Sequence, residues 1–188
     1  MKKKTVVLLL ALVLVVGVAV GGTMAWLIDT TAPVTNTFTT SDVDIELAES
    51  ENLDLQMVPG FTITKDPTVT VKANSESCFV FVKLEESENF DTFMTYTVAD
   101  GWTELTGVTG VYYREVTAPE SDQTFAVIKD NTVSVKSDVT KAQMNELTED
   151  TYPTLTVTAY ACQLAKTSTE NFTPADAWAQ VNGTASAN

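Results

Sequence analysis

The residues that could do chemistry in this 188-residue chain are few, and none of them is a histidine. Without histidine the chain cannot build a Ser-His-Asp or Cys-His nucleophile pair, an H-E-x-x-H zinc site or a His-ligated haem. Glu85 and Glu86 are adjacent carboxylates. Neighbouring residues of a strand point to opposite faces, so these two cannot flank one glycosidic bond. We therefore expect no catalytic residues, no cofactor, no metal site and no enzyme activity.

The two cysteines, Cys78 and Cys162, are the remaining candidates for chemistry. In an exported protein an even number of cysteines permits one disulfide. Alternation favours separate thiols, because Cys78 shares the apolar face of the expected strand 78–85, whereas Cys162 falls opposite the apolar face of the expected strand 154–164. Two separate, mostly buried thiols and a single disulfide both stay open.

Three carboxylates, of Asp42, Asp44 and Glu46, alternate with apolar side chains along the expected strand 42–47. Such a row of oxygen ligands could bind Ca²⁺, but the turn residues of a calcium loop are missing. A solvated outer face is the favoured interpretation. The alternation predicts that the opposite face enters the core, with the side chains of Val43, Ile45 and Leu47.

The N-terminal stretch has the pattern of a secretory signal peptide. Three lysines precede an unbroken apolar run from Val6 to Val20, and the small residue Ala25 fits a signal peptidase cleavage site. We place the cut after Ala25, so that Trp26 becomes the mature N-terminus. The alternative is a membrane anchor, since Val6 to Ile28 carries no charge and about 20 apolar residues can span a bilayer.

The same boundary carries a family resemblance. The stretch 21–29, Gly-Gly-Thr-Met-Ala-Trp-Leu-Ile-Asp, resembles the cleavage site of proteins processed by the SipW-type signal peptidase, the TasA/camelysin-like biofilm matrix proteins of Gram-positive bacteria. The stretch 35–47 is similar to that family's first mature strand, with Ser41 where a glycine is usual. A further match runs from Met57 through the Lys-Asp-Pro-Thr-Val-Thr-Val stretch to the Val-Phe-Val-Lys strand ending at Lys83.

The amino-acid composition argues against one class of binding partner, the nucleic acids. The net charge is −14, and three of the 11 basic residues but none of the 25 acidic ones precede the expected cut. The mature chain therefore carries eight basic against 25 acidic residues, a net charge of −17. Such a surface repels phosphate backbones, which argues against nucleic-acid binding, and it makes self-association depend on salt.

The remainder of the sequence predicts an all-β domain. Short β-branched and aromatic runs alternate at period two between polar turns, which favours an antiparallel β-sandwich of jelly-roll type after the signal peptide helix. One or two short helices are expected, after Asp138 or Thr140 and after Thr173. Further strands are expected at 96–98, 110–116, 124–129 and 132–136, with a tight hairpin at Asp130-Asn131. The expected divisions are residues 1–25 as signal peptide, 26–40 as an extended segment, 41–182 as one β-sandwich domain and 183–188 as a flexible tail.

The extended segment 26–40 is the candidate for function. It is rich in threonine and uncharged after Asp29, and it could complete the sheet of a neighbouring subunit as a donor strand. Its apolar residues form the candidate assembly set: Trp26, Leu27, Ile28, Val34 and Phe38. The alternative is that this segment packs onto its own domain or stays disordered.

The resemblance implies a secreted structural subunit of extracellular matrix fibres, at the cell surface or in the matrix. Its partners would be further copies of itself and other matrix proteins, with the SipW-type peptidase during export. A monomeric adhesion or ligand-binding module, using loops around Trp102 to Tyr113, is the second hypothesis. A camelysin-like protease is the third, and the absence of histidine argues against it.

Overall fold

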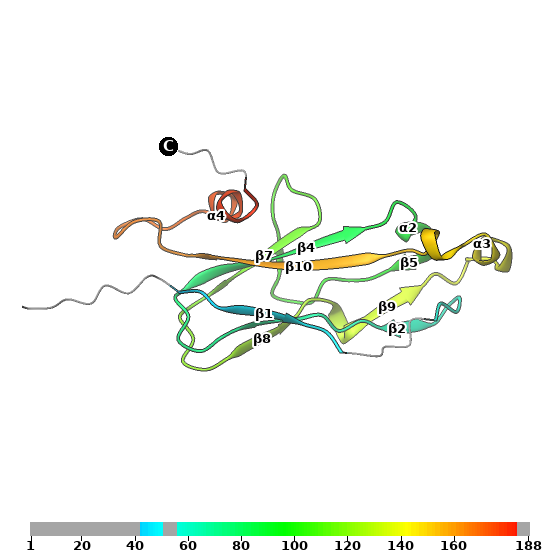
Figure 1. Ribbon diagram of the computed structural model, residues 1–188, viewed down its shortest axis with the longest axis horizontal. Coiled ribbons are helices and arrows are strands. Elements are labelled where there is room, and N and C mark those ends of the chain that lie inside the picture. Colours follow the sequence, from blue (N-terminus) through cyan, green and yellow to red (C-terminus); the bar gives the residue numbers. More distant parts are fainter. Residues whose placement is uncertain (1–41, 51–55, 184–188) are drawn as a thin grey trace, which may run out of the picture. The chain divides into compact units, whose positions relative to one another are not determined.

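The computed structural model describes residues 42–50 and 56–183, and within them the protein is an all-β structure with a few short helices (Figure 1). Every strand pair in these residues is antiparallel. The sequence-based prediction of an antiparallel all-β protein is therefore confirmed at this level. The predicted signal peptide and the extended segment 26–40 lie outside the described residues.

The largest unit is a four-stranded sheet. In spatial order its strands are β10 (Leu155–Gln163), β4 (Cys78–Glu86), β7 (Val111–Val116) and β6 (Thr103–Glu104). The central strand β4 reads Cys-Phe-Val-Phe-Val-Lys-Leu-Glu-Glu, and its first five residues are all buried. A strand covered on both faces is expected to have such a near-continuous apolar run.

Two three-stranded sheets complete the strand pairing. One has the order β1 (Ile45–Ala48), β3 (Thr68–Val71) and β8 (Gln123–Ala126); the other has the order β2 (Thr62–Thr64), β9 (Thr132–Val135) and β5 (Met94–Thr95). The chain passes from the first of these sheets to the second through the 3₁₀ turn η1 (Lys129–Asn131). Asp130 and Asn131 both have positive φ, as a tight turn requires. The predicted hairpin is nevertheless wrong, because β8 and β9 belong to different sheets.

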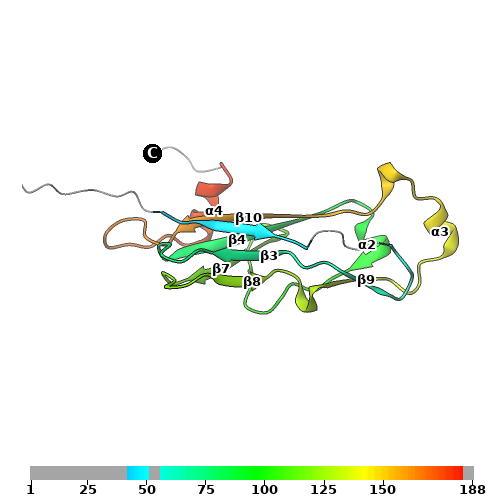
Figure 2. The ribbon, with the colours of Figure 1, turned by 60° about the horizontal axis from the view of Figure 1, so that its bottom comes forward.

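The core has two parts, one on each face of the four-stranded sheet. One face carries Cys78, Val80, Val82 and Leu84, and these pack against apolar residues of the two smaller sheets. The other face carries Phe79 and Phe81, which pack against the C-terminal helix α4 (Pro174–Val181) and its Trp178. Figures 1 and 2 show α4 beside the sheet. Burial on both faces explains why β4 shows no alternation between apolar and polar residues.

The helices begin at the predicted caps. The side chain of Thr173 accepts a hydrogen bond from the Asp176 N–H at the start of α4, with proline in the first turn. Thr140 and Gln143 form a capping box at the start of α3 (Lys141–Asn145). Two short elements escaped prediction: α2 (Phe90–Phe93) and the 3₁₀ turn η2 (Glu149–Thr151).

Two local predictions need correction. The expected strand at 96–98 is displaced to β5, and Val98 forms only an isolated bridge with Ile128. Leu47 does not enter the core, because its side chain is 38% exposed. It lies near the end of an edge strand that pairs with β3 alone, whereas Val43 and Ile45 pack against the core as expected.

Candidate assembly edge

The edge strand β10 is the most unusual surface feature of the described residues. It is nine residues long and is hydrogen-bonded in its sheet only to β4. Its sequence, Leu-Thr-Val-Thr-Ala-Tyr-Ala-Cys-Gln, contains no charge and no proline. Natural edge strands are normally short or protected by charges, prolines or bulges, because an open edge invites another strand to pair. A long uncharged edge is therefore a candidate interaction site.

The hydrogen bonds at the two ends of β10 show which of its groups point outward. The N–H of Leu164 donates to the C=O of Ser77 (2.7 Å), and the N–H of Ser87 donates to the C=O of Thr154 (3.0 Å). In an antiparallel ladder such pairs recur at every second residue, so the even-numbered residues of β10 bond to β4. The N–H and C=O groups of the odd-numbered residues point away from the sheet. We call this row the open edge: Leu155, Val157, Ala159, Ala161 and Gln163.

The strand β1 runs beside the open edge without pairing to it. The two strands are neighbours, and Figures 1 and 2 both show them side by side. No backbone hydrogen bond joins them among the described residues. The N–H of Lys72 donates to the C=O of Asp44, so the backbone groups of Ile45 and Leu47 also point away from β3. The unpaired edge of β1 and the unpaired edge of β10 therefore lie side by side.

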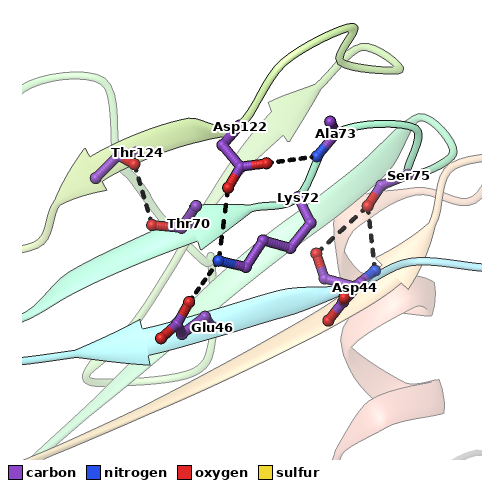
Figure 3. A network of polar contacts seen from close by, with 8 residues as sticks. All are labelled: Asp44, Glu46, Thr70, Lys72, Ala73, Ser75, Asp122 and Thr124. Carbon is purple, nitrogen blue, oxygen red and sulfur yellow. Dashed lines mark hydrogen bonds and ion pairs between the residues drawn. The ribbon is translucent and has the colours of Figure 1, made fainter.

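A polar network on the outer face fixes β1 to its own sheet (Figure 3). The Lys72 ammonium pairs with Glu46 at 2.5 Å and with Asp122 at 3.5 Å. The hydrogen bond that the Lys72 ammonium donates to the Glu46 carboxylate is the main cause that raises the pKa of Lys72. Ser75 Oγ accepts a hydrogen bond from the Asp44 N–H (3.2 Å). These contacts hold β1 in place while its other edge stays open.

The same network determines which contacts the acidic residues of the predicted strand 42–47 make. Glu46 is bound to Lys72, and Ser75 contacts the backbone rather than the carboxylate of Asp44. Within residues 42–50 and 56–183, no three His, Cys, Asp or Glu side chains form a group that could hold a metal ion. The side chains of Asp42, Asp44 and Glu46 are all exposed, as the solvated-face interpretation of this strand expects.

An apolar pocket of about 590 Å³ opens where β10 begins. Thr154 and Leu155, at the start of β10, form part of its wall together with Pro153 and Tyr152. Most of the remaining wall is apolar, and its main side chains are those of Met57, Ile63, Phe90, Met94, Met144 and Leu147. Sequence reasoning missed this pocket, because its residues come from six separate stretches and the sequence does not predict α2.

The two cysteines lie on adjacent strands but on opposite faces of the four-stranded sheet. Cys78 pairs with Gln163, and Cys162 pairs with Phe79, so the two side chains are offset by one residue. Both are free thiols, and the alternative of a disulfide is not formed. Burial raises the pKa of Cys78 to about 11 and also raises that of Cys162. Neither thiol is therefore poised as a nucleophile near neutral pH.

The loop cluster of the second hypothesis offers little free aromatic surface. The Trp102 indole donates to the C=O of Ala126 (2.8 Å), and the Arg114 guanidinium lies 5.2 Å from its ring centroid. Tyr112 and Tyr113 face opposite sides of the sheet, in the two separate core clusters, as the alternation predicted. Trp102 is thus engaged in packing rather than presented as a ligand platform.

Several predicted site residues lie outside the described residues. These are the cleavage-site residues Ala25 and Trp26 and the assembly residues Leu27, Ile28, Val34 and Phe38. None of the helices in the described part combines the length and the apolar character needed to cross a bilayer. Comparisons of the chain with protein-family models, with curated proteins and with solved structures return no match.

Proposed function

We propose that this protein is a secreted structural subunit of extracellular matrix fibres that assembles by β-strand complementation. The observation that supports this most directly is the open edge of β10, which is long, uncharged and free of proline. In the proposal, residues 26–40 of one subunit add as a strand to the open edge of the next. Backbone hydrogen bonds then supply the affinity, as in other cases of strand addition.

The donor segment and the open edge suit each other chemically. After Asp29 the segment carries no charge, so it can approach a mature chain with a net charge of −17 without repulsion. Its fifteen residues exceed the nine of β10, which leaves residues to connect the two subunits. Addition of one subunit to the next does not close on itself, so the product is a fibre rather than a ring.

The sequence resemblance to TasA/camelysin-like proteins supports the same function and a location in the extracellular matrix or at the cell surface. Under this proposal the domain is a β-sandwich of jelly-roll type. Cleavage between Ala25 and Trp26 by a SipW-type peptidase releases the donor segment. The partners are further copies of the same chain and other matrix proteins, and no catalytic step is involved.

The test is a deletion of Trp26 to Phe38 from the mature chain, compared with the intact mature chain by sedimentation and electron microscopy. We expect pelletable fibres from the intact chain and a folded, soluble monomer from the deletion variant. Deletion of residues 184–188 is the matched control and should leave fibre formation unchanged. Fibres from the 26–38 deletion would overturn the proposal, and an intact chain that stays monomeric at every salt concentration would favour an adhesion module.

A further inference from the structure

The apolar pocket is a direct continuation of the open edge. Leu155 is the first residue of the edge and also part of the pocket wall, and Thr154 and Pro153 extend that wall. A strand that pairs along β10 therefore reaches the pocket at one of its ends. What occupies the pocket depends on the direction in which that strand runs.

The placement of the strands favours one direction. β10 begins next to the pocket near α3 and runs toward α4, whereas β1 begins on the α4 side (Figures 1 and 2). A donor strand parallel to β10 would end on the α4 side of the acceptor subunit. The donor subunit's β1 follows that strand and also begins on the α4 side of its own domain. The α4 sides of the two domains would then face each other and block further addition. A donor antiparallel to β10 leaves at the pocket and places its own domain beyond α3. Only this arrangement repeats without limit.

An antiparallel donor brings its last residues to the pocket. Phe38 stands four positions before Asp42, the first described residue, and it is the only aromatic residue between 27 and 41. Four residues of extended chain span about 13 Å, which lets the donor domain clear the acceptor. Resting on the proposed function, we infer that the Phe38 side chain of one subunit occupies the pocket of the next and acts as its apolar anchor.

The pocket has the properties of a site for a neutral apolar side chain. Its volume of about 590 Å³ lies within the range of small-ligand sites, which is about 300–1,000 Å³. Three methionines line it, and their flexible side chains adapt to the shape of an occupant. Its one cation, Lys65, is already paired with Glu49 at 2.8 Å, so no anionic partner is required.

Two exposed apolar side chains lie close in sequence to residues of the pocket wall, and a third belongs to the wall itself. Val58 (40% exposed) and Phe61 (65% exposed) lie in the turn before β2, beside the end of β9. Tyr152, at the pocket itself, is 51% exposed. Exposed apolar residues that gather around a pocket are typical of interaction surfaces. The domain of an antiparallel donor would cover them.

The experiment is disulfide trapping between two singly substituted mature chains, in a background with Cys78→Ala and Cys162→Ala. One chain carries Phe38→Cys and the other carries Met144→Cys, a half-buried position in the pocket wall. We expect disulfide-linked dimers from the oxidised mixture of the two variants and a ladder of linked chains from the double variant. Thr39→Cys, one position away on the opposite side of the donor strand, is the matched control and should link to Met144→Cys far less.

A second measurement tests the inference in a chain that keeps both natural cysteines. In the otherwise natural mature chain, Phe38→Ala should raise the concentration needed for fibre formation about tenfold or more, whereas Thr39→Ala should not. An intramolecular link in the double variant, with none in the mixture, would place Phe38 in its own pocket and overturn the inference. Fibre formation by Phe38→Ala at the natural concentration would overturn the anchor but leave strand complementation standing. Failure of the unsubstituted mature chain to form fibres would overturn both.

Discussion

The guanidinium carbon of Arg114 lies 3.8 Å from the centroid of the Phe125 ring, and this contact joins two sheets. Arg114 belongs to β7 of the four-stranded sheet, and Phe125 belongs to β8 of the β1-β3-β8 sheet. The same guanidinium also lies against Trp102, whose indole donates to the backbone of β8. The only arginine in the chain is thus used to hold the core together rather than to bind a partner.

Replacing Arg114 by lysine should therefore destabilise the protein although the charge is kept. The planar guanidinium stacks on both rings, and an ammonium cannot reproduce that contact. We expect a loss of about 1–2 kcal/mol in the free energy of unfolding, measured by urea denaturation. Lys129→Arg, at an exposed site, is the control and should change stability by less than about 0.5 kcal/mol. Equal stability of Arg114→Lys and the natural chain would show that the stacking contributes nothing.

Two glycines offer a matched pair for backbone effects. Gly107 and Gly110 both have positive φ, so alanine is strained at either position, by about 1–2 kcal/mol. A Cβ at Gly110 would lie 2.6 Å from the C=O oxygen of Leu84, whereas a Cβ at Gly107 would meet nothing within 4 Å. Gly110→Ala should therefore lower the unfolding free energy by at least about 2 kcal/mol more than Gly107→Ala. Similar urea midpoints for the two variants would contradict this.

Much of the strand arrangement could be read from the sequence, because alternation and turn residues report local structure directly. Cys78 was assigned to the correct face of β4, and both longer helices begin at the predicted caps. Alternation did not predict burial correctly where a strand is covered on both faces, as β4 is, or on neither face, as at the end of β1. The opposite face of β4, with Phe79 and Phe81, is buried by a helix almost 100 residues later in the chain, and no local pattern indicates that contact.

The candidate site was less accessible to sequence reasoning. The segment 26–40 stands out by composition, but which strand is left open depends on the spatial order of the strands. Leu47 was expected in the core because it alternates with Asp44 and Glu46, yet it lies on an edge strand and is exposed. The pocket depends on short elements such as α2, for which the sequence carries only the spacing of Phe90 and Phe93 as a signal.

The buried thiol of Cys78 should make stability fall at high pH. Burial raises its pKa from 9.0 to about 11 in the folded protein, so the folded state holds the proton more tightly than the unfolded state does. This contribution is complete below pH 9 and is lost as the pH rises from 9 to 11, by up to about 1.4 kcal/mol per pH unit. Tyr96, whose pKa burial also raises, adds to the loss above pH 10.

The contribution of Cys78 can be separated with Cys78→Ala. We expect the variant to be less stable at pH 8, because it leaves a small cavity, but to lose less stability between pH 9 and 11 than the natural chain. Urea denaturation at pH 8, 9, 10 and 11 measures both effects. Parallel stability profiles for the two proteins would show that the ionisation of Cys78 is not coupled to unfolding.

The open edge can be blocked without disturbing the rest of the sheet. The N–H of Ala161 points away from β4, so proline at this position removes an outward donor and no bond of the existing ladder. Ala161→Pro should keep the unfolding free energy within about 1 kcal/mol of the natural value but prevent fibre formation, because the ring also obstructs an added strand. Ala161→Ser keeps the N–H and is the matched control, which should still form fibres. Thr158→Pro, whose N–H points to β4, should instead destabilise the fold by about 3 kcal/mol or more. Fibres from Ala161→Pro with natural yield and appearance, seen by electron microscopy, would mean that the subunits meet at a surface other than β10.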